Sequence, residues 1–309
     1  MGRFIAKRFL SVIPTMFVIV TLSFFIMRAA PGGPFSREKA VPPAIMENLL
    51  KKYHMDESLP KQYFRFLGGV IQGDLGPSFR NKDFTVMELI GSSLPNSIVL
   101  GLAALSIALV LGITVGIISA LKQNSAADYV SMSVAVTGIS VPNFVAGPLL
   151  MLVFAVIFKL LPTSGWIDGR AGFKAIILPA ITLSMNPFAY IARLSRASIL
   201  EALRSDYVRT ARAKGLSMPV IIFKHVLKGA MLPVVSYLGP ACAWIVTGSV
   251  VVERIFGIPG LGTWFVRSAI NRDYTLIMGT LIVYSLILVM LNFVVDILYG
   301  FMDPRISYK

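Results

Sequence analysis

The stretch SIVLGLAALSIALVLGITVGIISAL at residues 97–121 decides the fold, because its 25 residues contain no charge. A helix that crosses the hydrocarbon core of a bilayer needs about 20 predominantly apolar residues. Five further apolar segments have similar lengths, so the sequence predicts an all-α integral membrane protein with six transmembrane helices. The six predicted spans cover residues 10–27, 97–121, 130–158, 175–192, 231–252 and 275–302.

The composition of the 309-residue chain excludes the ordinary soluble and disordered classes. It has 56% hydrophobic and 14% charged residues, whereas a soluble domain has about 25% charged residues. The net charge of +14 would suggest nucleic acid binding in a soluble protein. Cytoplasmic loops of membrane proteins also collect Lys and Arg, so we expect membrane lipid around this chain and no nucleic acid partner.

The distribution of Lys and Arg predicts the orientation in the membrane. The N-terminus, the 121–129 loop, the 193–230 loop and the C-terminus together carry 14 Lys and Arg, against 6 in the two short loops on the other side. Positive residues near the ends of spans favour the cytoplasmic side. We therefore expect both termini in the cytoplasm.

Three regions follow from this topology. Residues 1–30 hold a cytoplasmic segment and the first span, which is too long for the apolar region of a signal peptide and is expected to be a retained anchor. Residues 31–95 form an external insertion, and residues 96–309 form a five-span core with the 193–230 loop in the cytoplasm. The insertion is either a cap on the helices or a docking surface.

The sequence contains no catalytic motif, so we do not expect this chain to be an enzyme by itself. The chain has no Gly-Lys dipeptide, and therefore no phosphate-binding loop of the Walker A type. His54 and His225 are the two histidines, and both lie outside the predicted spans. Asp296 is the one acid well inside a predicted span, where it is either functional or a structural hydrogen-bond partner.

Helix-breaking residues interrupt two predicted spans. Gly138 and Pro142 lie in the third, and Pro179 and Pro187 lie in the fourth. Such residues are tolerated at membrane depth where neighbouring helices or a cavity satisfy the freed backbone groups. We expect a kink in each span. The GxxxG pattern at residues 112–116 predicts a close approach between helices.

The long cytoplasmic loop contains SDYVRTARAKG at residues 205–215. Ser205 or Asp206 can cap the N-terminus of a helix, and Gly215 can end it. We predict a helix from Tyr207 to Lys214, which is about 12 Å long. A second helix is expected to start at Ser217.

One face of the first helix carries Tyr207, Thr210, Ala211 and Lys214, and is small in the middle. Two interpretations remain open from the residues alone. The loop is either a basic segment lying on anionic lipid or a short helix that docks into another protein.

This loop resembles the cytoplasmic loop of ABC-importer permeases, whose motif reads Glu-Ala-Ala, three residues, Gly and a later Ile-x-Leu-Pro. Gly215 stands at the glycine of the motif, while Arg-Thr-Ala at 209–211 replaces Glu-Ala-Ala. That departure matches the peptide-transport branch, which typically reads Tyr-Val-Arg-Thr-Ala-Arg-Ala-Lys-Gly, as residues 207–215 do. The same branch continues with a basic-His-x-Leu segment and Leu-Leu-Pro, represented here by residues 224–227 and 231–233.

The resemblance extends along nearly the whole chain. External stretches at 27–32, 52–54 and 73–79 are similar to those of the oligopeptide-permease B branch, and further similar stretches lie at residues 120–124, 248–253, 257–262 and 271–274. The chain is identified as a member of the dipeptide/oligopeptide permease family of ABC importers. The family fold implied is a type I ABC-importer permease with a large external insertion between helices 1 and 2.

The resemblance implies a permease subunit that forms half of the pathway of an ATP-driven oligopeptide importer in the bacterial inner membrane. It also implies a second homologous permease subunit, two cytoplasmic ATPase subunits and an external peptide-binding protein. No catalytic residue, metal site or cofactor is expected in this chain, since ATP and Mg would bind to the ATPase subunits. Dipeptide or metal-chelate cargo is the alternative within this class. A stand-alone secondary transporter or channel, or a receptor or structural protein, is the alternative from other classes.

Three groups of candidate residues follow from this interpretation. The ATPase-coupling helix is expected to comprise Asp206, Tyr207, Val208, Arg209, Thr210, Ala211, Arg212, Ala213, Lys214, Gly215 and Leu216. The translocation pathway is expected to be lined by polar residues of the third to fifth spans, namely Thr137, Ser140, Asn143, Ser184, Asn186, Tyr237, Trp244, Thr247 and Ser249. Glu253 and Arg254 are expected at an outer gate or a contact with the binding protein.

Overall fold

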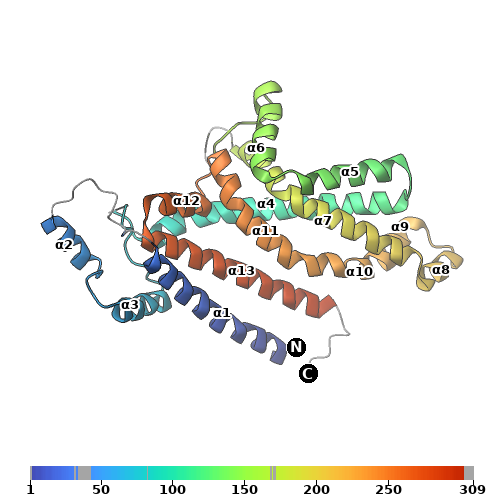
Figure 1. The fold of residues 1–309 in the computed structure, drawn as a ribbon. Helices are drawn as coiled ribbons and strands as arrows, with labels where there is room; N and C mark the ends of the chain where they lie inside the picture. Colours follow the sequence, from blue (N-terminus) through green and yellow to red (C-terminus); the bar gives the residue numbers. More distant parts are fainter. Residues whose placement is uncertain are drawn as a thin grey trace. The chain divides into compact units, whose positions relative to one another are not determined.

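The computed structural model describes residues 2–30, 33, 43–81, 83–167, 169 and 172–302. Within these ranges the chain is helical, with one isolated β-bridge between Pro77 and Thr85 (Figure 1). Some residues used in the sequence argument lie outside the described ranges, namely Pro31, Gly32, Arg170, Arg305 and Lys309.

The six predicted spans are confirmed, with one of them broken. Within the described residues, five helices are long and apolar enough to cross a membrane, and a bent pair of helices makes a sixth if the two form one span. The five are α1 (Gly2–Ala29), α4 (Val86–Leu121), α7 (Ile177–Leu203), α11 (Leu232–Phe256) and α13 (Tyr274–Met302).

Helices α4 and α7 extend well beyond their predicted spans. Helix α4 has 36 residues, about 54 Å, and begins 11 residues before the predicted span. Its start is fixed by a capping box, because the Thr85 backbone N–H donates to Glu88 Oε2 (2.7 Å) while the Glu88 N–H donates to Thr85 Oγ1 (3.2 Å). Helix α7 runs to Leu203 with Pro187 inside it, so the fourth span is not broken at Pro187 and much of the first third of the 193–230 loop is helical.

The third span breaks more sharply than the predicted kink. Helix α5 (Ala126–Ser140) and α6 (Asn143–Met151), which continues as the π-helical turn η1 (Leu152–Ile157), are bent by 113°. Val141 has an extended backbone, at φ −97° and ψ 115°, because a residue before proline is disfavoured in the helical region. Pro142 then stands at the N-cap of α6.

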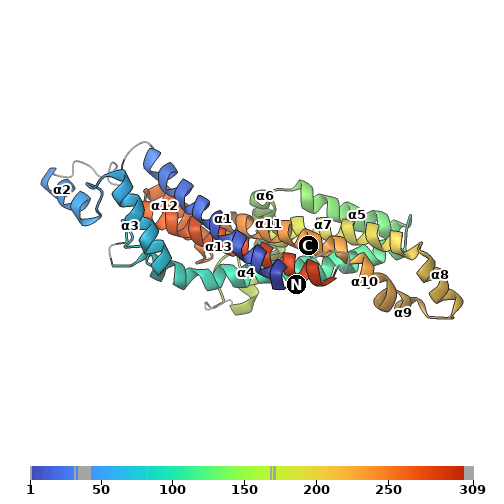
Figure 2. The same ribbon diagram turned by 90° about the horizontal axis from the view of Figure 1, so that it is seen from below.

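The chain divides into two compact units, and α1, α4 and α13 contribute to both. The first unit holds residues 1–8, 97–258 and 288–309. In it, α7 packs against α5 and α11, as both views show (Figures 1 and 2), and α6 packs against α7 and α11. A short 3-10 turn, η2 (Gly172–Ile176), precedes α7.

Glycines bring the helices of the first unit into backbone contact, as the GxxxG pattern predicts. A Cβ at Gly116 would lie 2.9 Å from the Ala192 carbonyl oxygen, and one at Gly112 would lie 3.1 Å from the Phe188 oxygen. A Cβ at Gly138 would lie 2.8 Å from the Met185 oxygen. Helices α4 and α5 therefore both rest directly on the backbone of α7.

Asp296, the acid inside a predicted span, forms an ion pair in the first unit. Its Oδ2 lies 3.0 Å from Nη1 of Arg8. Both side chains are partly exposed, and the pair gives Asp296 a structural partner.

The second unit holds residues 9–96 and 259–287. The insertion supplies α2 (Pro43–Lys52) and α3 (Leu59–Gln72). The same unit also contains α12 (Leu261–Asn271). Its centre is the buried carboxylate of Asp273, which accepts hydrogen bonds from the Ser78 hydroxyl and from the backbone N–H groups of Phe79, Arg80 and Leu276. This carboxylate ties the loop after α3 to the turn between α12 and α13.

Candidate coupling loop and translocation pathway

The short helix predicted in the 193–230 loop is present as α8 (Asp206–Ala213). Ser205 precedes it in an extended conformation at φ −73° and ψ 155°, as an N-cap residue requires. Gly215 follows at φ 74°, in the left-handed region that favours glycine. Helix α7 ends at Leu203 and α8 starts at Asp206, so only Arg204 and Ser205 separate a spanning helix from the helix in the loop.

The inner face of α8 differs from the predicted docking face. Val208 and Ala211 are buried in a small core of the loop, which they share with Ile199, Ile221 and Val226. Ala211 therefore packs against this chain and is not at the centre of a free face. The correction leaves Tyr207, Thr210 and Lys214 of the predicted face exposed.

The outer face of α8 is basic and is followed by exposed apolar side chains. Arg209, Arg212 and Lys214 are exposed, and Asp206 forms an exposed ion pair of 3.2 Å with Arg209. Beyond Gly215, apolar side chains of 38–71% exposure come from the end of the loop and from the helical turns α9 (Met218–Val220) and η3 (Ile221–Val226). We name Tyr207, Leu216, Met218, Val220 and Phe223 the apolar strip.

Sequence reasoning missed three members of the apolar strip, Met218, Val220 and Phe223, whereas Tyr207 and Leu216 belong to the predicted coupling helix. Phe223 is 71% exposed, although it follows the buried pair Ile221 and Ile222. The available signal was an aromatic residue in the 193–230 loop that directly follows two apolar residues, Ile221 and Ile222. Where such exposed apolar side chains adjoin, they mark a surface that a partner or a membrane covers. The turn α10 (Leu227–Ala230) then leads into α11.

A buried ion pair fixes the helices at the base of this loop. Arg196 of α7 donates to Asp128 of α5 through Nε (2.8 Å) and Nη2 (2.7 Å), and the Ser119 hydroxyl of α4 also donates to this carboxylate. A two-pronged arginine–carboxylate contact sets both distance and orientation. Sequence reasoning missed this pair, because its members are 68 residues apart.

The predicted pathway residues fall into three groups by exposure. Thr137, Ser140, Trp244 and Thr247 are exposed, whereas Asn143, Asn186 and Tyr237 are partly buried. Ser184 and Ser249 are buried, and their hydroxyls donate to carbonyl oxygens of their own helices. These two serines therefore face packed neighbours in this conformation and do not line an open space.

The break between α5 and α6 brings one group of pathway candidates together. A Cβ at Gly248 of α11 would lie 3.3 Å from Nδ2 of Asn143 and 4.0 Å from Nε1 of Trp244. Because Gly248 has no side chain, there is room beside it for the amide of Asn143, in the first turn of α6, and for the indole N–H of Trp244 on α11. Both groups can donate hydrogen bonds to carbonyl or carboxylate oxygens.

Tyr237 belongs to a second group, between α7 and α11. Its ring stacks on that of Tyr190 at 5.3 Å between centroids, and the guanidinium of Arg193 lies 4.9 Å from the centre of the Tyr190 ring. Arg193 is exposed. Tyr190 and Arg193 were not predicted, although their three-residue spacing on a helix was visible in the sequence.

The prediction for Glu253 needs a correction. Its side chain is fully buried, and Oε1 accepts a hydrogen bond of 2.7 Å from the Ser97 hydroxyl of α4. A buried carboxylate cannot contact an external protein in this conformation. Arg254, next in the chain, is exposed and remains available for such a contact.

Comparison with known families explains this arrangement of spans and loop. The profile of the family described as "Binding-protein-dependent transport system inner membrane component" matches residues 112–308, and a profile for the N-terminal part of such membrane components matches residues 1–101. The chain belongs to this family. It is a multi-pass membrane protein of the ABC permease type.

Individual members of the family match the chain over its whole length. The chain is 49% identical over 308 residues to the oligopeptide transport system permease protein OppB of Haemophilus influenzae, with 100% of both chains covered. It is 48% identical to the protein of the same name from Salmonella typhimurium, again over 100% of both chains. It is 44% identical to the dipeptide transport system permease protein DppB of Bacillus subtilis, over 99% of this chain and 98% of that one.

Solved structures of permeases confirm the predicted fold. The inward-facing MetNI methionine ABC transporter matches with a TM-score of 0.58 at 18% identity, over 70% of this chain and 97% of that chain. An amino acid ABC transporter determined with histidines matches with a TM-score of 0.51 at 18% identity, over 71% of this chain and 95% of that chain. The chain therefore has the type I fold of ABC-importer permeases.

Proposed function

We propose that this chain is a permease subunit of an ATP-driven oligopeptide importer and forms half of the peptide pathway. Its full-length relatives with 48–49% identity carry that name. The observation that carries the mechanism is α8, which is held by two buried residues on one side and is open to a partner on the other. We place the chain in the bacterial inner membrane with both termini in the cytoplasm.

Helix α8 acts as the contact with an ATPase subunit. Its exposed side and the apolar strip fill a groove on that subunit, while Val208 and Ala211 hold it to the loop. Closure of two ATPase subunits around ATP and Mg would move α8, and the turn at Arg204–Ser205 would pass that movement to α7. Coupling of this kind requires that the ATPase binds the two permease conformations with different affinity.

The remaining partners follow from the same proposal. A second, homologous permease subunit supplies the other half of the pathway, and an external peptide-binding protein delivers cargo, with Arg254 as a contact on this chain. The chain itself needs no catalytic group, because hydrolysis takes place on the ATPase subunits.

Peptide cargo suits the two groups of pathway residues. A peptide of variable sequence has only its backbone and its two termini as constant features. Asn143 and Trp244 supply N–H donors at one place, and Tyr237 supplies an aromatic face at another. So few donors bind the backbone weakly, which permits release.

Dipeptide cargo is the second candidate, because the relative from Bacillus subtilis that is 44% identical is named as a dipeptide permease. Competition uptake separates the two. Labelled tetrapeptide uptake by the reconstituted complex should be inhibited by unlabelled tri- to pentapeptides more strongly than by dipeptides. Stronger inhibition by dipeptides would reverse the assignment of cargo.

The coupling role is tested by variants on the outer face of α8. Arg212→Glu and Tyr207→Ala should reduce peptide uptake at least tenfold while the chain still inserts and the second permease subunit still co-purifies. Lys122→Glu is the matched control, because Lys122 is an exposed cation on the 121–129 loop and should leave uptake within twofold. Normal uptake by both α8 variants would disprove the coupling role.

The class of transporter is tested by purification. The tagged chain, extracted from native membranes in mild detergent, should bring down a second six-span subunit and ATPases with Walker motifs in equal amounts. Purification of this chain alone, with uptake in the absence of ATP, would instead indicate a secondary transporter or channel.

A further inference from the structure

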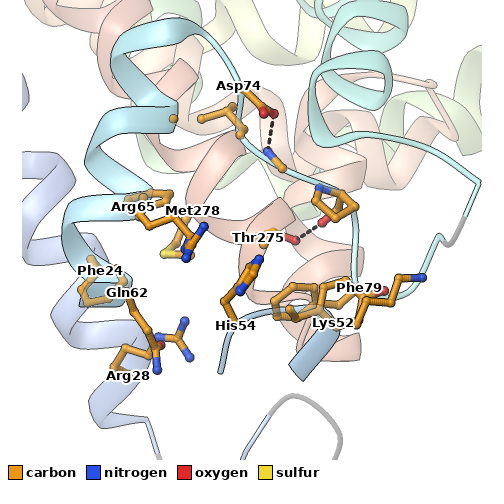
Figure 3. Close-up of a pocket in the computed structure, with 16 residues that line it drawn as sticks. Phe24, Arg28, Lys52, His54, Gln62, Arg65, Asp74, Phe79, Thr275 and Met278 are labelled. Atoms are coloured by element: carbon orange, nitrogen blue, oxygen red, sulfur yellow. Dashed lines mark hydrogen bonds between the residues drawn. The ribbon is translucent and has the colours of Figure 1, made fainter. Parts of the chain in front are cut away.

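We propose that the second unit holds one anionic glycerophospholipid, whose headgroup enters a basic cavity and whose acyl chain lies in an adjoining apolar groove. The cavity has a volume of about 370 Å³ and opens among α1, α2, α3, the loop after α3 and the start of α13 (Figure 3). The groove has a volume of about 220 Å³ and lies between α1 and α13. Met278 lines both.

The cavity carries an excess of positive charge. Arg28, Lys52 and Arg65 line it together with His54, whereas Asp74 is the one carboxylate among its lining residues. The Asp74 carboxylate already accepts a hydrogen bond of 2.9 Å from the Gly76 backbone N–H. The charge of Arg65 is partly balanced by Glu57, which is 2.7 Å away and does not line the cavity. Hydrogen bonds from Arg65 and Lys61 hold the pKa of the Glu57 carboxyl below its usual value.

Two polar groups of the cavity lack partners within the described residues. Nε of Arg28 is buried without a hydrogen bond, and so is Oε1 of Gln62. Gln62 is only 8% exposed, and its Nε2 donates to the carbonyl oxygens of Met55 (3.2 Å) and Glu57 (2.7 Å). Those two bonds orient the amide and leave Oε1 as a free acceptor. Buried polar groups normally have a partner, so this pair indicates a ligand.

The two free groups define the chemistry of that ligand. Arg28 needs an acceptor, and a phosphate diester satisfies a guanidinium with a charge-assisted hydrogen bond. Gln62 needs a donor, which a hydroxyl group provides. An anionic phosphate that carries hydroxyl groups, such as the headgroup of phosphatidylglycerol, meets both requirements.

The adjoining groove distinguishes a lipid from a water-soluble anion. Its lining is apolar apart from Ser23, whose hydroxyl donates to the Ile19 carbonyl oxygen of its own helix. From Met27 to Ile19 the groove follows α1 for eight residues, about 12 Å, the length of a substantial part of an acyl chain. The groove is lined by Ile19, Leu22, Ser23, Ile26, Met27, Ile277, Met278 and Leu281.

The position along the helices also suits a lipid. Arg28 is one residue from the end of α1, and Thr275 of the cavity is in the first turn of α13. Both candidate spans therefore end where the cavity begins. Cations at that level meet the phosphate layer of a membrane, where they attract anionic headgroups.

The experiment compares lipids on the complex purified from native membranes and stripped of bound lipid by detergent exchange. Phosphatidylglycerol should raise the thermal unfolding midpoint by several degrees more than phosphatidylcholine does. Native mass spectrometry should retain one phosphatidylglycerol per copy of this chain. Glycerol-1-phosphate at millimolar concentration should give no increase, because it has no acyl chain.

Variants locate the effect in the second unit. Arg28→Gln and Lys52→Gln should each remove at least half of the increase that is specific to phosphatidylglycerol. Lys51→Gln is the matched control, since Lys51 neighbours Lys52 on α2 but pairs with Glu47 at 2.7 Å and does not line the cavity. Ile26→Trp should lower retention of the lipid by narrowing the groove while it leaves the basic cavity intact.

Three results would overturn the proposal. Equal stabilisation of the unaltered chain by the two lipids would remove the specificity for anionic headgroups, whatever the variants do. Equal stabilisation by glycerol-1-phosphate would replace the lipid with a water-soluble anion. Losses in Lys51→Gln equal to those in Lys52→Gln would reduce the effect to general surface charge.

Discussion

Two Asp–Arg pairs in the first unit have the same chemistry and very different surroundings. The pair of Asp128 and Arg196 joins α5 to α7, with side-chain exposures of 4% and 27%. The pair of Asp206 and Arg209 lies on α8, with exposures of 94% and 77%. The N–O distances are 2.7 Å and 3.2 Å.

The surroundings decide what each pair does. An exposed pair gains little in water, typically 0–1 kcal/mol. Removal of one partner from a buried pair leaves an uncompensated charge and costs about 3–5 kcal/mol. The first pair therefore fixes the helices, whereas the second leaves the surface of α8 free to bind a partner.

The largest effect is expected for Asp128→Ala, because Arg196, whose side chain is 27% exposed, would keep its partly buried charge without a carboxylate. The free energy of unfolding should fall by about 3–5 kcal/mol, measured by denaturant unfolding in detergent. The double variant Asp128→Leu/Arg196→Met should be less destabilised than Asp128→Ala. A loss below ~1 kcal/mol would show that the pair is solvated and would remove the contrast with α8.

Ala211→Arg should have the next largest effect, because it places a charged side chain in the core around Val208 and Ile221. We expect a loss of stability of at least ~2 kcal/mol and loss of uptake as a consequence. Ala213→Arg is the matched control, since Ala213 is exposed on the same helix and should leave thermal unfolding unchanged. Equal thermal unfolding midpoints for the two variants would instead indicate that Ala211 lies on a free docking face.

Gly116→Ala tests the close approach of α4 to α7, which holds the buried pair in place. The new methyl group would lie 2.5 Å from Cβ of Ser195, and overpacking of this kind costs about 1–3 kcal/mol. Gly101→Ala is the control on the same helix, because its methyl group would lie 3.4 Å from Ile245 Cγ2. Similar unfolding midpoints for the two would show that the contact at Gly116 relaxes without cost.

The smallest effect is expected for Asp206→Ala. It removes the exposed pair and a negative charge at the N-terminus of α8, which together stabilise by about 0.5 kcal/mol. The unfolding midpoint should stay within the error of the measurement, at low and high salt alike. A fall comparable to that of Asp128→Ala would contradict the distinction between the two pairs.

Features that depend on neighbours in the sequence could be predicted. Helix α8 follows from Ser205 before it and Gly215 after it, since both act on the backbone next to them. The capping box of Thr85 and Glu88 is equally local, and it was an available signal for the early start of α4. The spans themselves follow from length and apolarity alone.

Features that depend on distant partners could not be predicted. Glu253 ends a span like a surface residue, but Ser97, 156 residues away in the chain, holds it in the interior. Pro142 predicts a break, whereas the angle of 113° depends on how α6 packs against α11.

The buried face of α8, by contrast, could have been predicted, because Val208 and Ala211 are apolar and three residues apart.

The glycine contacts on α7 have a mechanical consequence. Backbones in contact at Gly112, Gly116 and Gly138 cannot slide past each other without a clash, so α4, α5 and α7 tilt as a single stiff body. Helix α7 is 27 residues long, about 40 Å, so a rotation of ~5° at one end displaces the other by roughly 3–4 Å. Under the proposed coupling, a rotation that enters α7 beside Arg204 would therefore displace the far end of the helix in proportion to its length.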